Sequence, residues 1–143
     1  KIIIEKAILI NNFYKKHLRY KPKIAITGLN PHCESFSKKE DERIIKPAIK
    51  QLIKHGYNVS GPYAADTIFL NNNRKKFNVI IGMYHDQVLG PLKSLHEFDA
   101  INITVGLPFI RISPDHGPNE IMIGKNKSNP LSLIKAITFL DRN

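Results

Sequence analysis

Two short apolar runs, at residues 23–27 and 77–81, constrain the fold of this chain more than any other feature. Each has the length and the β-branched content of a buried strand rather than of a helix. Segments with apolar residues at helical spacing lie before, between and after them. Because expected strands alternate with expected helices, the sequence predicts an α/β fold with interleaved strands and helices.

The remaining elements follow from apolar spacing and from turn residues. Gly56 is expected to end a helix, Pro47 to bend that helix, and the Gly61-Pro62 pair to end a short extended piece that starts at Val59. The length of 143 residues suits one domain. The other expected elements are helices at 3–19, 37–55, 84–95 and 130–140, strands at 101–105 and 109–112, and a polar connector at 71–76.

Composition narrows the class of protein. Apolar residues make up 42% of the chain, which argues against disorder, and no apolar run is long enough to cross a membrane. A lone cysteine, Cys33, excludes an internal disulfide and fits the cytoplasm. The net charge of +10 permits an anionic partner, but Lys, Ile and Asn fill 52 of 143 positions, as AT-rich codons would produce. Such a partner would be nucleic acid or a phosphorylated small molecule. Arg, which binds phosphates and bases more specifically than Lys, appears only five times, so nucleic acid is not the expected partner.

Two histidines lie just past the two buried runs. His32 closes the turn at 28–32 (Gly-Leu-Asn-Pro-His), and His85 lies in the segment 82–87 (Gly-Met-Tyr-His-Asp-Gln). Ligands bind outside the carboxyl ends of strands in open α/β sheets, so the two imidazoles are candidates for one shared metal ion. The alternative is that each caps a helix or bonds a carbonyl. Asp86 either orients the His85 ring or is a first-turn carboxylate that the helix dipole favours. Cys33 is either a soft metal ligand or an inert buried thiol.

Three polar side chains further along are candidates for substrate contact. Lys93 lies two helical turns after His85, Asn102 is on the polar face of an alternating strand, and Arg111 follows an apolar stretch. A lone Arg in such a stretch indicates a paired charge or an anion clamp. Structural hydrogen bonds or surface charge are the competing explanations for all three.

These segments together resemble the 4-hydroxythreonine-4-phosphate dehydrogenase family of pyridoxal phosphate biosynthesis. The resemblance covers essentially the whole chain and indicates that residues 1–143 are the carboxyl-terminal segment of a longer dehydrogenase. The absent amino-terminal portion would supply a third metal histidine and further substrate contacts. The matching motifs lie, in the family's order, at 28–32, 61–67, 83–87, 102–111 and 113–117.

The resemblance implies a homodimer with an isocitrate/isopropylmalate dehydrogenase-like fold. It implies NAD and a divalent metal (zinc, magnesium or cobalt) as cofactors, and a phosphorylated small-molecule substrate. The implied reaction is oxidation of 4-phosphooxy-L-threonine, followed by loss of carbon dioxide. The implied site residues are His32 and His85 for the metal; Lys93, Asn102 and Arg111 for the substrate; Lys93 and Asp86 for catalysis; and His116, Gly117 and Asn129 for the cofactor.

Two loops depart from the family pattern. Residues 33–39 are shorter and more basic than usual, and Pro118-Asn119 replaces Thr and a small residue. Alternatives therefore stay open: a paralogous dehydrogenase of another phosphorylated four-carbon hydroxy acid, a non-catalytic dimerisation remnant, or a basic RNA-binding module. The last lacks the aromatic-rich stacking motif of such modules. With two histidines, we expect this segment alone to catalyse poorly, because the metal would lack a third protein ligand.

Overall fold

The computed structural model describes residues 1–31, 33, 39–117 and 120–142. Its contacts divide the chain into two compact units, Lys1–Leu89 and Gly90–Asn143, each described here by itself. The chain length predicted a single domain, whereas the structure has two compact units. The reason is that the strands form two separately hydrogen-bonded sheets, one in each unit.

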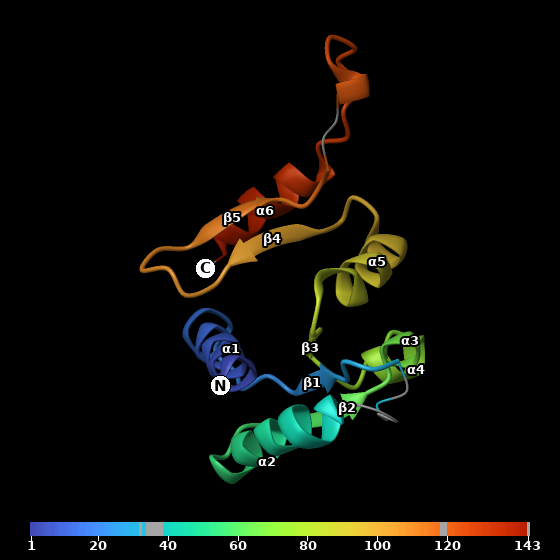
Figure 1. The fold of residues 1–143 in the computed structure, drawn as a ribbon. Coiled ribbons are helices and arrows are strands. Elements are labelled where there is room, and N and C mark those ends of the chain that lie inside the picture. The colour runs from blue at the N-terminus through green and yellow to red at the C-terminus, as the bar shows by residue number, and fades with distance from the viewer. Residues whose placement is uncertain (32, 34–38, 118–119, 143) are drawn as a thin grey trace. The chain divides into compact units, whose positions relative to one another are not determined.

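The first unit is a parallel sheet with helices (Figure 1). The chain order starts with a helix that continues as a π-helical turn at Tyr14–Leu18, and a second π-helical turn, Asp41–Ile45, leads into another helix. The elements are α1 (Ile2–Phe13), β1 (Ile24–Thr27), α2 (Lys46–Lys54), β2 (Val59–Tyr63), α3 (Ala65–Ile68), α4 (Asn71–Arg74), β3 (Val79–Ile81) and the start of α5 (His85–His96).

Strand β1 is the centre of this sheet, which has the order β2-β1-β3. Ile24 pairs with Val59 of β2 on one side and with Val79 of β3 on the other, both in parallel. All four residues of β1 are buried, which explains why the strand reads as a continuous apolar run. The core around it consists of Ala7, Ile24, Ile26, Ile45, Ile49, Leu52 and Val59. Each fully buried Ile or Leu contributes about 1.5–3 kcal/mol relative to exposure.

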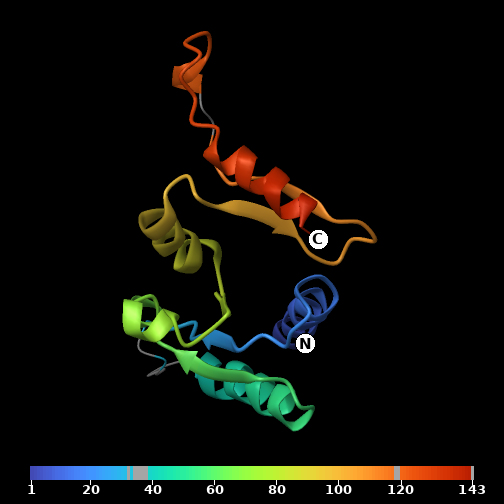
Figure 2. The ribbon, with the colours of Figure 1, turned by 180° about the vertical axis from the view of Figure 1, so that it is seen from behind.

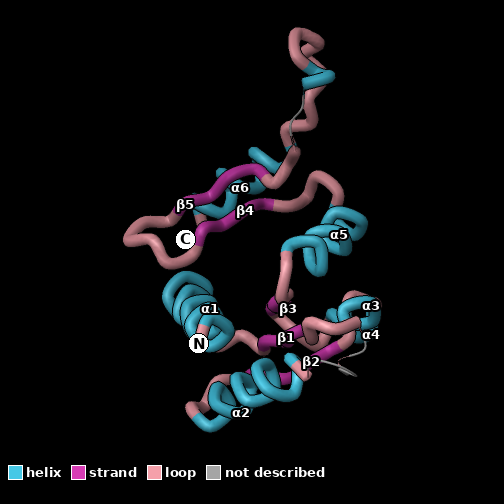
Figure 3. The backbone as a smooth tube through the Cα atoms, in the orientation of Figure 1, coloured by secondary structure: helices cyan, strands magenta, loops and turns pink. Residues whose placement is uncertain are grey.

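The second unit pairs an antiparallel hairpin with one helix (Figures 2 and 3). Strand β4 (Ile101–Thr104) runs against β5 (Arg111–Pro114), and a short 3-10 turn at Glu120–Met122 follows. Helix α6 (Leu131–Asp141) lies along the hairpin in both views. This unit also contains the carboxyl-terminal part of α5.

The interleaved α/β fold is confirmed, as are the helix terminators. The first helix ends at Arg19, which adopts a left-handed conformation, and Gly56 ends α2 with φ of +80°. The effect of Pro47 on this helix differs from a simple bend. Pro47 lies in the first turn of α2, directly after the π-helical turn Asp41–Ile45, so the helix changes from π-helical to α-helical winding at this proline.

Three predicted boundaries are wrong. Strand β2 continues through Gly61-Pro62 instead of ending there, because β2 is an edge strand and tolerates a proline without an N–H. Part of the expected polar connector forms the one-turn helix α4. The last strand begins at Arg111 rather than Phe109, where pairing with Thr104 starts. The Ser37 part of the predicted capping box lies outside the described residues. No helix in the described ranges is long and apolar enough to cross a membrane.

Gly61 is required by both conformation and space. Its φ is +138°, and an added Cβ would lie 2.4 Å from the carbonyl oxygen of Ile26 in β1. Gly56 shares the positive φ, but its Cβ would meet nothing within 4 Å. We predict that Gly61→Ala lowers the free energy of unfolding by about 3 kcal/mol or more, and Gly56→Ala by only about 1 kcal/mol. Urea unfolding followed by circular dichroism measures both, and equal losses would contradict the steric argument.

Candidate functional site

The predicted convergence of two turns at one sheet edge is confirmed. Because β1 and β3 are parallel neighbours, their carboxyl ends lie side by side. Gly28 follows β1 directly, and Gly82 follows β3 and leads into α5. His85 is the first residue of α5. His32, the other predicted metal ligand, lies outside the described residues, so its role stays a prediction.

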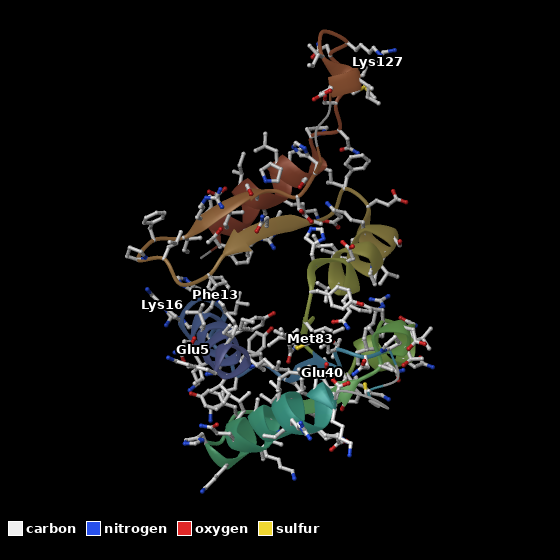
Figure 4. The ribbon with its side chains drawn as sticks, in the orientation of Figure 1. Glu5, Phe13, Lys16, Glu40, Met83 and Lys127 are labelled. Carbon is white, nitrogen blue, oxygen red and sulfur yellow. The ribbon has the colours of Figure 1, made fainter. Side chains whose placement is uncertain are left out.

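The buried side chain of Gln87 joins these two turns. Its Nε2 donates to the Gly28 carbonyl oxygen over 2.7 Å, and its Oε1 accepts from the Met83 N–H over 2.7 Å. The Thr27 hydroxyl lies 2.6 Å from the same Oε1 and 3.2 Å from the Ile81 carbonyl oxygen, so it donates to either one. Met83 lies where the chain leaves β3 (Figure 4). The Gln87 amide therefore fixes the distance between the turns that follow β1 and β3.

A second buried polar side chain, Asp41, fixes the turn after β1. Its carboxylate accepts hydrogen bonds from the backbone N–H groups of Leu29 and Asn30 at 2.7 and 3.3 Å, and from the Asn30 side chain at 2.9 Å. Gly28 fits beneath it, since an added Cβ would lie 3.2 Å from Asp41 Oδ1 and 2.8 Å from Cys33 Sγ. The conformation of this turn is thus set from outside the strand.

The ring of His85 contacts the carboxylate of the next residue, Asp86. Its Nδ1 lies 2.7 Å from Asp86 Oδ1, and the side chain of His85 is 76% exposed. When the carboxylate accepts from Nδ1–H, the Nε2 lone pair is left to bind a metal. This contact corresponds to one of the two roles predicted for Asp86, that of orienting His85.

The Cys33 thiol also lies near this turn. Burial raises the pKa of this thiol, and the negative charge of Asp41 raises it further, against the opposing effects of a hydrogen bond with the Gly28 backbone and of the Lys46 charge. A thiol with a raised pKa is a poorer metal ligand, because metals bind the thiolate. Within the described ranges, no three His, Cys, Asp or Glu side chains gather as a metal centre.

In the second unit, Lys93 is held at the end of β5. Its ammonium group forms an ion pair with Asp115 Oδ2 at 3.0 Å and also donates to the Asp115 carbonyl oxygen. The Asp115 N–H donates to the buried Ser132 hydroxyl over 2.8 Å, and that hydroxyl donates to the Ala100 carbonyl oxygen. Ser132 thereby ties the start of α6 to the loop that carries Asp115.

The structure brings Asn102 and Arg111 together on adjacent strands. Asn102 is exposed on β4, and Arg111 begins β5 with its Nη1 donating to the Thr104 hydroxyl over 2.8 Å. The predicted cofactor residues follow β5. His116 is exposed, with Nδ1 3.0 Å from the Gly117 carbonyl oxygen, and Asn129 accepts from the Leu131 N–H at the start of α6. The altered pair 118–119 lies outside the described residues.

The sequence did not single out Gln87, Asp41 or Ser132. Gln87 carried a usable signal, because it lies two positions after His85 within a family motif. Asp41 lies in a charged stretch that is typical of a solvated helix start, and Ser132 lies between two leucines in the first turn of an expected helix.

The resemblance assigns His32, His85 and Arg111 to one enzyme site. That assignment stays a prediction, since His32 is not described and the other two belong to separately described units.

Comparison with known proteins decides the family. The pattern of the family "Pyridoxal phosphate biosynthetic protein PdxA" matches residues 1–140. The chain belongs to this family. A 4-hydroxythreonine-4-phosphate dehydrogenase from Sulfurihydrogenibium sp. (strain YO3AOP1) is 47% identical over 138 residues, which cover 94% of this chain and 42% of that protein.

Two further relatives extend the comparison. A crystal structure of a 4-hydroxythreonine-4-phosphate dehydrogenase from Burkholderia phymatum superimposes with a TM-score of 0.73 at 35% identity, covering 95% of this chain and 42% of that one. A protein from Oceanobacillus iheyensis, designated a candidate D-threonate 4-phosphate dehydrogenase, is 44% identical over 119 residues, which cover 81% of this chain and 36% of that protein. The predicted family and its isocitrate/isopropylmalate dehydrogenase-like fold are confirmed. The chain spans about two fifths of the length of such relatives.

Gln87 provides a direct test of this arrangement. We predict that Gln87→Met lowers the free energy of unfolding by about 2–4 kcal/mol, because the Gly28 carbonyl and the Met83 N–H lose a buried partner. Gln51→Met, at an exposed position of α2, is the matched control and should change stability by less than about 0.5 kcal/mol. Thermal or urea unfolding measures both variants. Equal stability of the Gln87→Met and Gln51→Met variants would show that the Gln87 hydrogen bonds do not hold the turns after β1 and β3 together.

Proposed function

We propose that this chain is a segment of a metal- and NAD-dependent dehydrogenase that oxidises 4-phosphooxy-L-threonine in pyridoxal phosphate biosynthesis. The observation that carries the proposal is the placement of Asn102 and Arg111 on adjacent strands, within the motif order of the matched family. The reaction class is taken from the relative in Sulfurihydrogenibium, which is named as a 4-hydroxythreonine-4-phosphate dehydrogenase.

His85 suits a divalent metal, because Asp86 orients its ring and leaves Nε2 exposed. We propose His32 as a second ligand, since it follows the turn that Gln87 and Asp41 fix beside β3. The family resemblance implies a third histidine ligand in the amino-terminal part of the longer family chain.

Arg111, Asn102 and Lys93 are the proposed substrate residues. A guanidinium binds phosphate or carboxylate through paired hydrogen bonds, and an amide donates to the remaining oxygens. Lys93 forms an ion pair with Asp115. We propose Lys93 as the residue that relays a proton in catalysis, together with Asp86 as the partner of His85.

The proposed cofactor residues are His116, Gly117 and Asn129, at the two ends of the segment between β5 and α6. When bound, the metal would stabilise negative charge on the substrate's alcohol oxygen, and NAD would accept the hydride. The resulting β-keto acid then loses carbon dioxide. A cytoplasmic homodimer is the proposed assembly, on the strength of the family resemblance.

A second candidate substrate has its own support. The Oceanobacillus relative, of similar identity, bears the name of a dehydrogenase acting on D-threonate 4-phosphate. This compound shares the phosphate and the carboxylate with 4-phosphooxy-L-threonine but lacks the amino group. Discrimination between the two therefore depends on groups that contact the amino-bearing carbon.

The metal proposal predicts which imidazole matters. Titration of the chain with Co²⁺, followed by its visible absorption, should give binding that His85→Ala abolishes. Asp86→Asn should weaken the affinity about 10–100-fold, because the ring loses its orienting partner. His55→Ala, at an exposed histidine after α2, is the control and should bind like the unmodified chain. Loss of equal size in the His55 and His85 variants would contradict the assignment.

Substrate choice is tested by NADH formation with 4-phosphooxy-L-threonine and with D-threonate 4-phosphate. We expect slow turnover by this chain alone, because the metal lacks a third protein ligand, and a clear preference for 4-phosphooxy-L-threonine. Arg111→Ala should lower kcat/KM by about 100-fold, as loss of an ion-paired contact predicts. Preference for D-threonate 4-phosphate would favour the second candidate, and rapid turnover by this chain would contradict the incomplete metal site.

A further inference from the structure

The hairpin of the second unit has one face that is polar throughout. The register pairs Thr104 with Arg111 and Asn102 with Ser113. Residues directly opposite each other in an antiparallel pair point to the same side, and so do alternate residues along each strand. All four side chains therefore lie on one face of the hairpin, whereas the neighbouring residues of each strand lie on the other.

Helix α6 packs on the opposite face. Ile101 of β4 lines a cavity of about 340 Å³ together with Ile134 and Thr138 of α6, so the side of the hairpin that carries Ile101 faces the helix. The helix lies behind the hairpin in Figure 1 and in front of it in Figure 2, consistent with cover on one side. Within this unit, α6 leaves the polar face uncovered.

Among the described residues, the polar face offers donors with no partner. Arg111 donates one N–H to the Thr104 hydroxyl, at 2.8 Å, and its side chain is exposed. This bond holds the guanidinium beside β4 and uses one of its five N–H donors. Among the residues that the structure describes, the side chains of Asn102 and Ser113 form no hydrogen bond.

We propose that this face binds an oxyanion group, phosphate or carboxylate, of the small-molecule substrate, with Ser113 as a further binding residue and Thr104 as a positioning residue for Arg111. The inference rests on the proposed function. Ser113 lies opposite Asn102, so its hydroxyl and the Asn102 amide can donate to one oxyanion beside the guanidinium. Thr104 acts by holding Arg111, and its β-branched side chain is restricted in χ1.

The test is a titration of the full chain with 4-phosphooxy-L-threonine, inorganic phosphate and L-threonine, followed by backbone amide shifts in NMR spectra. We expect Ser113→Ala and Thr104→Val each to weaken binding about tenfold, the loss of one hydrogen bond to a charged group. Thr104→Ser keeps the hydroxyl and should restore most of the affinity. Thr138→Val is the control on α6, where the hydroxyl donates to the Ile134 carbonyl oxygen, and should bind like the unmodified chain.

The three probes separate the outcomes. Loss of affinity for inorganic phosphate assigns the face to the phosphate group, and loss for L-threonine assigns it to the carboxylate. Binding of 4-phosphooxy-L-threonine that neither variant changes would overturn the inference and leave the proposed function standing. Binding of inorganic phosphate alone, weakened by both variants, would support the inference and contradict the proposed substrate. Binding of none of the probes would overturn both. Unchanged amide spectra outside the hairpin verify that each variant folds.

Discussion

The side-chain amide of Gln87 is the interaction on which the candidate site of the first unit depends. Parallel strands bring their carboxyl ends to one edge, but backbone pairing stops there and leaves the following turns unconstrained. Gln87 replaces the missing strand pairing by bonding one turn through its NH2 group and the other through its oxygen. Because the amide is buried, loss of one partner would leave an unsatisfied polar group, which holds the turns in one arrangement. His85, two residues earlier in the same helix, gains a fixed position from it.

The second unit uses the same physical device with different groups. There the buried Ser132 hydroxyl joins α6, β4 and the loop after β5, and Asp115 in that loop holds Lys93. The proposed substrate residues Asn102 and Arg111 are set on one face of the hairpin by strand register. In both units, buried polar side chains hold the turns and loops that carry the proposed site residues.

Much of this was predictable from sequence. The apolar runs at 23–27 and 77–81 predicted strands β1 and β3. Strand β1 is buried and central, as a continuous apolar stretch indicates, whereas β3 is a half-buried edge strand and not the fully buried strand predicted. The alternation of residues 101–105 predicted the polar face of β4 correctly. A contact between Asp86 and His85 was one of two alternatives, and the structure shows this contact. These features depend on local pattern alone.

The parts that failed depend on partners distant in sequence. Pro62 continues β2 only because β2 is an edge strand, a position that no local pattern reveals. Gln87 bonds Gly28 across 59 positions of sequence, and Asp41 bonds Leu29 from a segment that reads as a solvated helix start. The division into two units follows from which strands pair, and pairing is also non-local.

Paramagnetic broadening tests most directly whether the turns after β1 and β3 form one metal site. Bound Co²⁺ broadens the NMR signals of nuclei in its neighbourhood. We expect substoichiometric Co²⁺ to broaden the amides of Leu29, Asn30 and His85 together, at the same metal concentrations. Broadening around His85 while Leu29 and Asn30 stay sharp, or broadening of the two turns at different concentrations, would contradict a shared site.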